Sequence, residues 1–543
     1  MSSVADSVRP VRRGGYAPRA GRGQLAGTGG LLRLALRRDR VLLPVWVVVV
    51  AGIVLAMPGS LEGFYGTAAE RADAMASMNS NSSMRALYGP VFGDSIGALA
   101  AWRIGCYAGV LAAVMSLVIV VRHTREEEET GRQEMLSAAV VGRRAPLTAA
   151  LLAACVANAA VGLLIAVGLA GRGAGGALAL GLGVGGVGML FAGLAAVVAQ
   201  CAESARLAKG ITAGALGAAF VLRAAGDAGT AGGSSALTWV SPLGWQENLR
   251  AYAGERWWVL LVLGAAIVVQ ACVAYGLAGR RDVGMGFLPT RPGPARGTLA
   301  TAGGLAWRLQ RGTLGAWTAG FLVAGVVFGG MASGAADIVG DNENARNVVE
   351  RLGGQSGLTD AFLATMTGLF GMIAALFVVA SVLRLHGEET SQRAEPVLAG
   401  AVGRLRWAAG HLVVAFGGSV LLMAAAGLGL AVGHGEDAGA VLGACLAQLP
   451  AVWVVGGVAV LLAGAFPKAA PAAWGVVGVC LAIGWIGPVL ELPGAVMDLS
   501  PFGHLPKLPG SAMSWPPLVL LTVLAAALVT AGLAGLRRRD MTG

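Results

Sequence analysis

Long apolar stretches separated by short polar segments run along the whole chain. A helix needs about 20 mostly apolar residues to cross a lipid bilayer. The first apolar stretch follows the polar, arginine-rich residues 1–40 and lacks a small-residue cleavage site, which predicts a retained helix rather than a cleaved signal peptide. The pattern predicts twelve membrane-spanning helices, at 41–58, 104–121, 146–169, 177–200, 209–226, 257–278, 313–332, 361–383, 408–432, 438–465, 471–490 and 515–536.

The composition agrees with this pattern. Hydrophobic residues make up 56% of the chain, charged residues make up 13%, and there are 86 glycines. A soluble chain could not cover so much apolar surface with so few charges, and a disordered chain would not be so apolar. We therefore expect an all-α polytopic membrane protein. The fourth and tenth stretches are rich in glycine, which favours close packing between helices.

The net charge of +11 is distributed unevenly. With twelve spans, 29 of the 40 lysines and arginines fall on the side of the N-terminus. The positive-inside rule then predicts that both termini are cytoplasmic, in a multi-pass protein of the bacterial cell membrane with the lipid bilayer as its first partner. No aromatic platform, helix-turn-helix or zinc-knuckle pattern accompanies the basic residues, so we expect no nucleic-acid partner.

The cysteines and histidines stand singly. Neither residue type shows the spacing of metal ligands, so we expect free thiols and no metal site. Leucines alternate with arginines at 31–38 and again at 305–311. Each segment is interpreted either as a short amphipathic helix at the cytoplasmic interface or simply as a positively charged flank.

The chain contains an internal repeat. Residues 127–143 match residues 388–404 without a gap, and eight of the seventeen positions are identical. A second match joins Ser241-Pro242-Leu243-Gly244-Trp245 to Ser500-Pro501-Phe502-Gly503-His504. Both matches fall at equivalent places in a six-span unit, which predicts two tandem parallel six-helix repeats.

The repeat suggests a domain organisation. We expect a cytoplasmic tail with an interfacial helix at 1–40, a first transmembrane half at 41–278, a cytoplasmic linker at 279–304 and a second half at 305–543. Two parallel halves would enclose a central path between them.

The segment repeated after the second span of each half is acidic. Glu128 and Arg132 stand four residues apart in the order that stabilises a helix, as do Glu389 and Arg393. Glu127 and Glu134 would share one helix face. The spacing predicts one short charged helix per half, facing the cytoplasm; the alternative is a solvated loop, which would explain arginines but not repeated glutamates.

Residues 127–143 resemble the cytoplasmic motif E-x-E-x-G-x-x-E-x-L-x-x-x-P-V-x-R of ABC-2-type ABC exporter permeases. In the first half, Val140 replaces the motif's proline. In the second half Thr390, Gln392, Val397 and Ala401 depart from the motif, and Pro396 is expected to interrupt the helix just after Glu395. The matching residues are Glu127, Glu129, Gly131, Glu134, Leu136, Val141 and Arg143 in the first half, and Glu388, Glu395, Val402 and Arg404 in the second.

The fused twelve-span layout also resembles actinobacterial exporters of polyketide antibiotics of the tetronasin-resistance type. The resemblance implies that the acidic segments dock an ATPase subunit. The chain has no G-x-x-x-x-G-K-[ST] motif, so we expect ATP and Mg²⁺ on a separate ATPase chain, in two copies, and no cofactor on this one. The candidate coupling residues are Glu127, Glu128, Gly131, Arg132, Glu134, Arg143, Glu388, Glu389, Arg393, Glu395 and Arg404.

The repeated Ser-Pro-x-Gly segments form the second candidate site. Proline and glycine imply a fixed backbone turn. The resemblance implies that both segments belong to re-entrant helices that cap the outer end of the path. The alternative is an interfacial aromatic belt. The candidate cap residues are Ser241, Pro242, Gly244 and Trp245 in the first half, and Ser500, Pro501, Gly503 and His504 in the second.

Two arginines lie close to predicted spans. Arg103 and Arg223 are interpreted either as anchors that reach the outer interface or as substrate contacts, with anchoring preferred. No Asp or Glu falls in the middle of a span, which argues against ion-coupled transport.

The function expected from these features is a permease subunit of an ATP-driven exporter that extrudes hydrophobic compounds such as antibiotics. The chain itself is expected to have no catalytic residues and not to be an enzyme. The alternatives are a proton-coupled multidrug antiporter and a membrane-embedded enzyme. No cluster of His, Asp and Glu at catalytic spacing favours the enzyme.

Overall fold

The computed structural model describes residues 23–137, 141–230, 235–282, 284–288, 297, 299, 301–332, 358–435, 437–486 and 493–540. The regular elements within these ranges are all helices, which confirms the predicted all-α class. The chain divides into two compact units. The first comprises the described residues within Met1–Glu62, Val91–Asp227 and Gly233–Arg291, and the second comprises those within Gly63–Pro90, Ala228–Gly232 and Pro292–Gly543.

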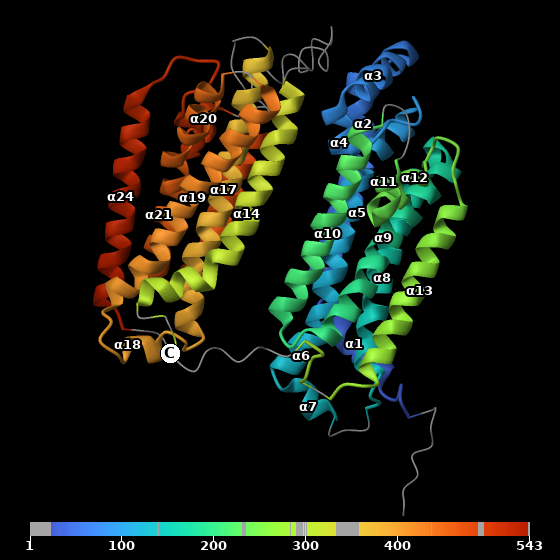
Figure 1. Cartoon of the computed structure of the whole chain (residues 1–543), viewed down its shortest axis with the longest axis horizontal. Coiled ribbons are helices and arrows are strands. Elements are labelled where there is room, and N and C mark those ends of the chain that lie inside the picture. Colours follow the sequence, from blue (N-terminus) through green and yellow to red (C-terminus); the bar gives the residue numbers. More distant parts are fainter. Residues whose placement is uncertain are drawn as a thin grey trace, which may run out of the picture. The chain divides into compact units, whose positions relative to one another are not determined.

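The first unit is a bundle of long helices with short helices at both ends (Figure 1). Helices α1 (Thr28–Arg38), α6 (Arg125–Glu129) and α7 (Arg132–Ser137) lie at one end, and α11 (Ala236–Val240) and α12 (Pro242–Asn248) lie at the other. The long helices are α2 (Leu42–Phe64), α5 (Ile96–Arg122), α8 (Ala145–Gly168), α9 (Ala174–Cys201), α10 (Ala205–Ala228) and α13 (Trp258–Ala278).

The second unit is also a bundle of long helices. Helix α18 (Glu395–Leu398) lies at the end of this bundle where α17 and α24 terminate (Figure 1). The long helices are α14 (Ala302–Ala332), α17 (Leu358–Thr390), α19 (Arg404–His434), α21 (Leu449–Ala465), α22 (Ala472–Ile486) and α24 (Trp515–Arg538); the shorter ones are α3 (Ala68–Ser80), α4 (Ser82–Tyr88), α20 (Ala438–Leu446) and α23 (Gly494–Met497).

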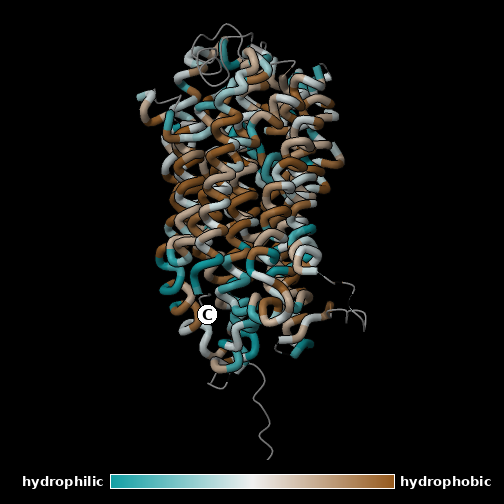
Figure 2. The backbone as a smooth tube through the Cα atoms, turned by 90° about the vertical axis from the view of Figure 1, so that its left-hand side faces the viewer, coloured by the Kyte–Doolittle hydropathy of each residue, from teal (hydrophilic) through white to brown (hydrophobic). Residues whose placement is uncertain are grey.

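The predicted spans correspond to these helices. Hydrophobic residues concentrate along the middle of the long helices and hydrophilic residues toward their ends (Figure 2). Within the described residues, 11 helices are long and apolar enough to cross a membrane, with α20 and α21 together forming one of them. The predicted span 471–490 coincides with the shorter apolar helix α22, and its residues 487–490 lie outside the described ranges.

Glycine permits close backbone contact at the two helices where its abundance predicted it. A Cβ atom on Gly181 of α9 would lie 2.3 Å from the carbonyl oxygen of Gly162 in α8. A Cβ atom on Gly464 of α21 would lie 2.0 Å from the carbonyl oxygen of Gly532 in α24. Because real Cβ atoms do not approach an oxygen so closely, these helix pairs require glycine at their crossings.

The two leucine–arginine segments differ. Residues 31–38 lie in the separate helix α1. Residues 305–311 lie in the first turns of the long helix α14, so of the two alternatives for this segment the short separate helix is wrong. Nothing between Ala302 and Ala332 breaks the backbone hydrogen bonding, because this segment contains no proline. Within the predicted linker 279–304, residues 283, 289–296, 298 and 300 lie outside the described residues, and residues 302–304 already belong to α14.

Candidate functional site

The acidic segment of the first half folds as two short helices. Helix α6 ends at Glu129, and α7 begins at Arg132. Gly131 between them has a φ of 68°, a left-handed conformation that glycine adopts without strain. The prediction of one continuous charged helix is therefore wrong, and Glu127 and Glu134 lie on different helices. Val140, which replaces the motif's proline, lies outside the described residues.

The acidic segment of the second half repeats this break. Helix α17 continues through Glu388 and Glu389 to Thr390, and α18 begins at Glu395. Gln392, which is equivalent to Gly131, also has a positive φ, of 58°. Pro396 lies in the first turn of α18, where a missing N–H is tolerated, so it starts this helix rather than interrupting it after Glu395.

The charge pairs within the two segments are equivalent but differ from the predicted ones. Arg132 lies 3.7 Å from Glu127, and Arg393 lies 2.9 Å from Glu388. The partners in these pairs are five residues apart rather than the predicted four, and a residue with positive φ lies between them in both halves. The pairing five residues apart is the same in both halves.

Glu128 and Glu389, the second glutamates of the two segments, are buried and each binds an arginine that the sequence analysis did not single out. Arg281, just after α13, donates to both carboxylate oxygens of Glu128, with 2.8 Å between Nη1 and Oε2. Arg539, the C-cap of α24, donates to both carboxylate oxygens of Glu389, at 2.5 and 2.6 Å. Such two-pronged, charge-assisted pairs are strong and hold a fixed geometry.

The last arginine of each motif binds the backbone of the arginine that holds the buried glutamate. Arg143 donates from Nη2 to the backbone carbonyl of Arg281 at 2.5 Å. Arg404, its equivalent in the second half, donates from Nη1 to the backbone carbonyl of Arg539 at 2.6 Å. In each half, the second glutamate and the last arginine of the motif therefore bind the same residue, Arg281 or Arg539, at the end of the last helix.

The same arginines also contact the fourth long helix of each half. Nε of Arg281 donates to Oε1 of Gln200 at 2.6 Å, and Gln200 is the last residue but one of α9. Nε of Arg539 donates to the carbonyl of Gly464 at 2.8 Å, and Gly464 is the last residue but one of α21. We call these two clusters the arginine hubs: Glu128, Arg143, Gln200 and Arg281 in the first half, and Glu389, Arg404, Gly464 and Arg539 in the second.

The repeat contains a signal for the hub arginines. Gly-Leu-Ala-Gly followed by Arg-Arg-Asp ends the first half at 276–282, and the same residues with two insertions end the second half at 532–540. Terminal arginines after a membrane helix are usual, so the topology rule alone does not distinguish these two from the other basic residues.

Other residues of the two acidic segments are exposed. Glu134 and Met135 lie on the surface of α7, and Met135 is 71% exposed. Glu395 and Pro396 lie on the surface of α18. The segments thus divide into buried residues that hold the fold and exposed residues that can contact another molecule.

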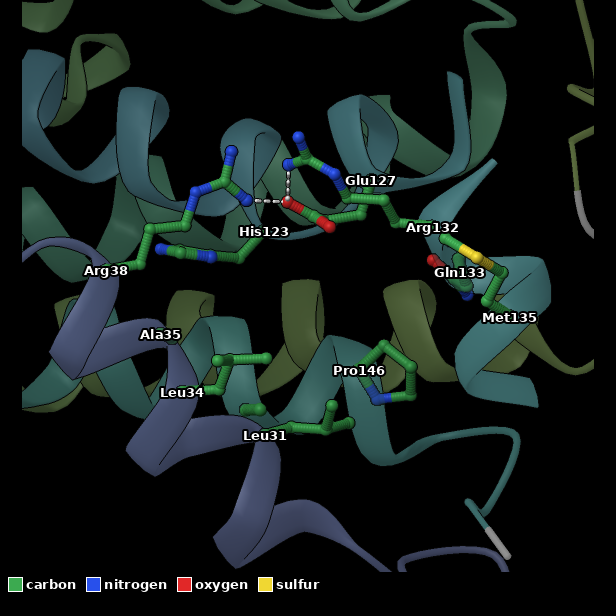
Figure 3. Close-up of a pocket in the computed structure, with 11 residues that line it drawn as sticks. Leu31, Leu34, Ala35, Arg38, His123, Glu127, Arg132, Gln133, Met135 and Pro146 are labelled. Carbon is green, nitrogen blue, oxygen red and sulfur yellow. Dashed lines mark hydrogen bonds and ion pairs between the residues drawn. The ribbon is translucent and has the colours of Figure 1, made fainter. Parts of the chain in front are cut away.

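A cavity of about 360 Å³ lies between α1 and the acidic segment of the first half (Figure 3). Leu31, Leu34 and Ala35 of α1 form an apolar side. On the other side, Arg38 of α1 and Arg132 of α7 both bind the carboxylate of Glu127 (Figure 3). An apolar floor with a charged rim suits the docking of another protein segment.

The Ser-Pro-x-Gly segments form the same turn in both halves, as predicted. The amide of Gly244 donates to the carbonyl of Ser241, and the amide of Gly503 donates to that of Ser500, both at 3.0 Å. Each serine is the N-cap of the short helix that follows. Trp245 donates from Nε1 to the carbonyl of Trp239, and Nε2 of His504 lies 2.9 Å from the carbonyl oxygen of Asp498.

The two arginines near the spans have different surroundings. Arg103 is half-buried on α5. Arg223 is fully buried, with Nη1 3.1 Å from Asp227 and 3.4 Å from Glu247 of α12. Thr238 of α11 donates to Asp227 at 2.6 Å. The preferred expectation that Arg223 reaches the outer interface is therefore wrong, because two carboxylates hold its guanidinium inside the protein.

Burial, together with the nearby carboxylate of Asp227, raises the pKa of Glu247 well above its usual range. The raised pKa favours the neutral form of Glu247 in a cluster that has one guanidinium for two carboxyl groups. The cluster attaches α11 and α12 to the end of α10.

Comparison with known proteins identifies the family. The chain is 43% identical to the multidrug efflux system permease protein Rv1217c of Mycobacterium tuberculosis (strain ATCC 25618 / H37Rv), with 99% of each chain covered. The chain belongs to the Rv1217c permease family. A model of the C-terminal domain of the multidrug efflux system permease Rv1217c matches residues 299–537. The Rv1217c relationship confirms the predicted permease family and the multi-pass membrane location; the likeness to tetronasin-resistance exporters stays a prediction.

Proposed function

We propose that this Rv1217c-family chain is the membrane-spanning subunit of an ATP-driven exporter of hydrophobic compounds, and that a separate ATPase subunit binds its two acidic segments. The observation that carries the proposal is the repeated fold of these segments: two short helices per half, broken at Gly131 and Gln392, with an exposed glutamate at equivalent positions. Membership of an efflux-permease family supports the transport role.

Glu134 and Glu395 are the proposed contact residues. Each lies in the first turn of its short helix, and each side chain is exposed. In the first half, the cavity beside α1 and the exposed Met135 extend this surface. Two equivalent surfaces suit two copies of an ATPase, which would hold the ATP and Mg²⁺.

The experiment is co-purification followed by transport. The tagged chain is isolated with its ATPase and reconstituted in proteoliposomes, and export of the hydrophobic dye ethidium is measured with ATP present and the proton gradient dissipated. We expect ATP-dependent export under these conditions. Export that needs the gradient and not ATP would identify a proton-coupled antiporter instead.

Charge reversal tests the docking surface. We expect Glu134→Lys and Glu395→Lys together to weaken ATPase binding on the order of tenfold, because each places a cation where an anion is recognised. The matched control is Asp73→Lys on α3, an exposed carboxylate outside both segments. Unchanged ATPase retention by the double variant would contradict the assignment of the surface.

A further inference from the structure

Each arginine hub joins the cytoplasmic ends, as predicted by topology, of four long helices in its own half. In the first half, the side chain of Arg281 binds Glu128 after α5 and Gln200 at the end of α9, while its backbone follows α13. The carbonyl of Arg281 accepts from Arg143, which precedes α8. One residue therefore connects the second, third, fourth and last long helices.

The second hub has the same connections. Arg539 caps α24 and binds Glu389 near the end of α17 and the carbonyl of Gly464 near the end of α21. Its own carbonyl accepts from Arg404, the first residue of α19. Two halves with different sequences at most positions thus retain one carboxylate, two arginines and one acceptor in the same bonding pattern.

The hub makes the acidic segment and the last helix move together. The side chain of Glu389 is 1% exposed and that of Arg539 is 14% exposed, and the values for Glu128 and Arg281 are 3% and 9%. Displacing the segment relative to the helix would break two charge-assisted hydrogen bonds and leave a buried charge without its partner. A rigid displacement of both elements breaks neither bond.

We propose that Arg281 and Arg539 are positioning residues that transmit displacement of the acidic segments to α13 and α24, the last helices of the two halves. The proposal rests on the proposed function, because the displacement comes from an ATPase bound at α7 and α18. It places the coupling at residues outside the recognised motif and identifies the last helix of each half as a driven element. The exposed glutamates bind the ATPase, and the hubs transfer its motion.

The test measures ethidium exported per ATP hydrolysed in proteoliposomes that contain the chain and its ATPase. Arg281→Gln and Arg539→Gln are made singly and together. We expect the complex to retain its ATPase and to hydrolyse ATP, while ethidium exported per ATP falls about tenfold in the double variant. Arg280→Gln and Arg538→Gln are the matched controls, because these adjacent arginines are exposed.

Lysine variants separate the geometry from the charge. Arg281→Lys and Arg539→Lys keep the positive charge but lose the two-pronged bond, so we expect intermediate transport per ATP and normal folding. The lysine variants also test the proposal if a glutamine variant fails to fold. Normal transport per ATP in the lysine and glutamine variants would overturn the proposal.

The two proposals fail in different ways. If the wild-type complex exports ethidium without ATP, the proposed function is wrong. If the wild type needs ATP but the hub variants resemble Arg280→Gln and Arg538→Gln, only the role of the hubs is wrong. Loss of ATPase binding in the hub variants would also contradict it, because it would place Arg281 and Arg539 in the docking surface rather than behind it.

Discussion

The two arginine hubs share a bonding pattern but are braced by different neighbours. Glu128 of the first hub also accepts from Arg125, at 2.6 Å, and from the amide of Gly284, at 3.3 Å. The hub arginines also have different further acceptors: Arg281 donates to the carbonyl of Met285 at 2.9 Å, and Arg539 donates to the carbonyl of Ala463 at 3.2 Å. The repeat therefore preserves the joint and not its surroundings.

The Ser-Pro-x-Gly turns, at the bundle ends opposite to the hubs, differ more in the side chains that hold them. In the first half, the buried cluster of Arg223, Asp227 and Glu247 holds α12 against α10. The equivalent Ser500–His504 turn contains no carboxylate. The hydroxyl of Ser241 donates to the carbonyl of Ala219 at 2.6 Å, whereas the hydroxyl of Ser500 lies buried beside the thiol of Cys480. In the first half, the turn at Ser241 is therefore held by a buried cluster of charged side chains.

The largest expected effect is the loss of stability when the buried guanidinium of Arg223 is removed from the first half. Arg223→Met leaves the two buried carboxyl groups of Asp227 and Glu247 without their guanidinium partner and is expected to cost about 3–5 kcal/mol of stability. Arg206→Met is the control, on the same helix but exposed. Thermal unfolding in detergent measures both, and similar midpoints for the two variants would contradict a structural role for the cluster.

Removing Arg125, which binds Glu128 of the first hub, is expected to lower stability by a smaller amount. Arg125→Gln removes a buried guanidinium that binds Glu128 and the carbonyl of Met285, at a cost of about 3 kcal/mol. His386 occupies the equivalent position in the second half, and its Nδ1 has no hydrogen-bond partner among the described residues. We expect His386→Gln to change stability by about 0.5 kcal/mol or less. Equal losses of stability in Arg125→Gln and His386→Gln would show that the residues at this position support the two hubs equally.

The cluster of Arg223, Asp227 and Glu247 predicts a pH dependence to which Glu247 contributes. Its pKa is raised in the folded protein, so its stabilising contribution is full below its ordinary pKa, near 4.3, and is lost as the pH rises through the raised pKa. The loss is at most about 1.4 kcal/mol per pH unit. We expect Glu247→Gln to remove this part of the slope when unfolding midpoints are compared across pH; parallel profiles for variant and wild type would show that Glu247 does not titrate in this way.

The smallest effects concern the break between the short helices. Gly131→Ala places a side chain at a φ of 68° and is expected to cost about 1 kcal/mol. Gln392→Gly relieves the strain at the equivalent residue but adds chain entropy to the unfolded state, so we expect a gain of about 0.5 kcal/mol. Unfolding midpoints that move in the same direction in both variants would show that the two breaks are not equivalent.

The sequence predicted the long helices well and the site incompletely. Apolar length sufficed to locate α8 and α24 to within two residues at each end, because a bilayer span depends on composition more than on neighbours. The sequence places the acidic segments correctly, but the single continuous helix that it predicts for each is wrong. Helical spacing favoured a pair between Glu128 and Arg132, whereas Arg281, 153 positions further along, takes the carboxylate.

By itself, the sequence determined the membrane class, the helical fold, the Ser-Pro-x-Gly turns and the position of the two motif copies, because each depends on local composition or a short pattern. Only the tertiary structure showed which glutamates are buried, that Arg223 is held by two carboxylates, and that one arginine per half joins four helix ends. These properties depend on residues far apart in the chain, and burial decides which of several chemically equivalent charges form the pairs.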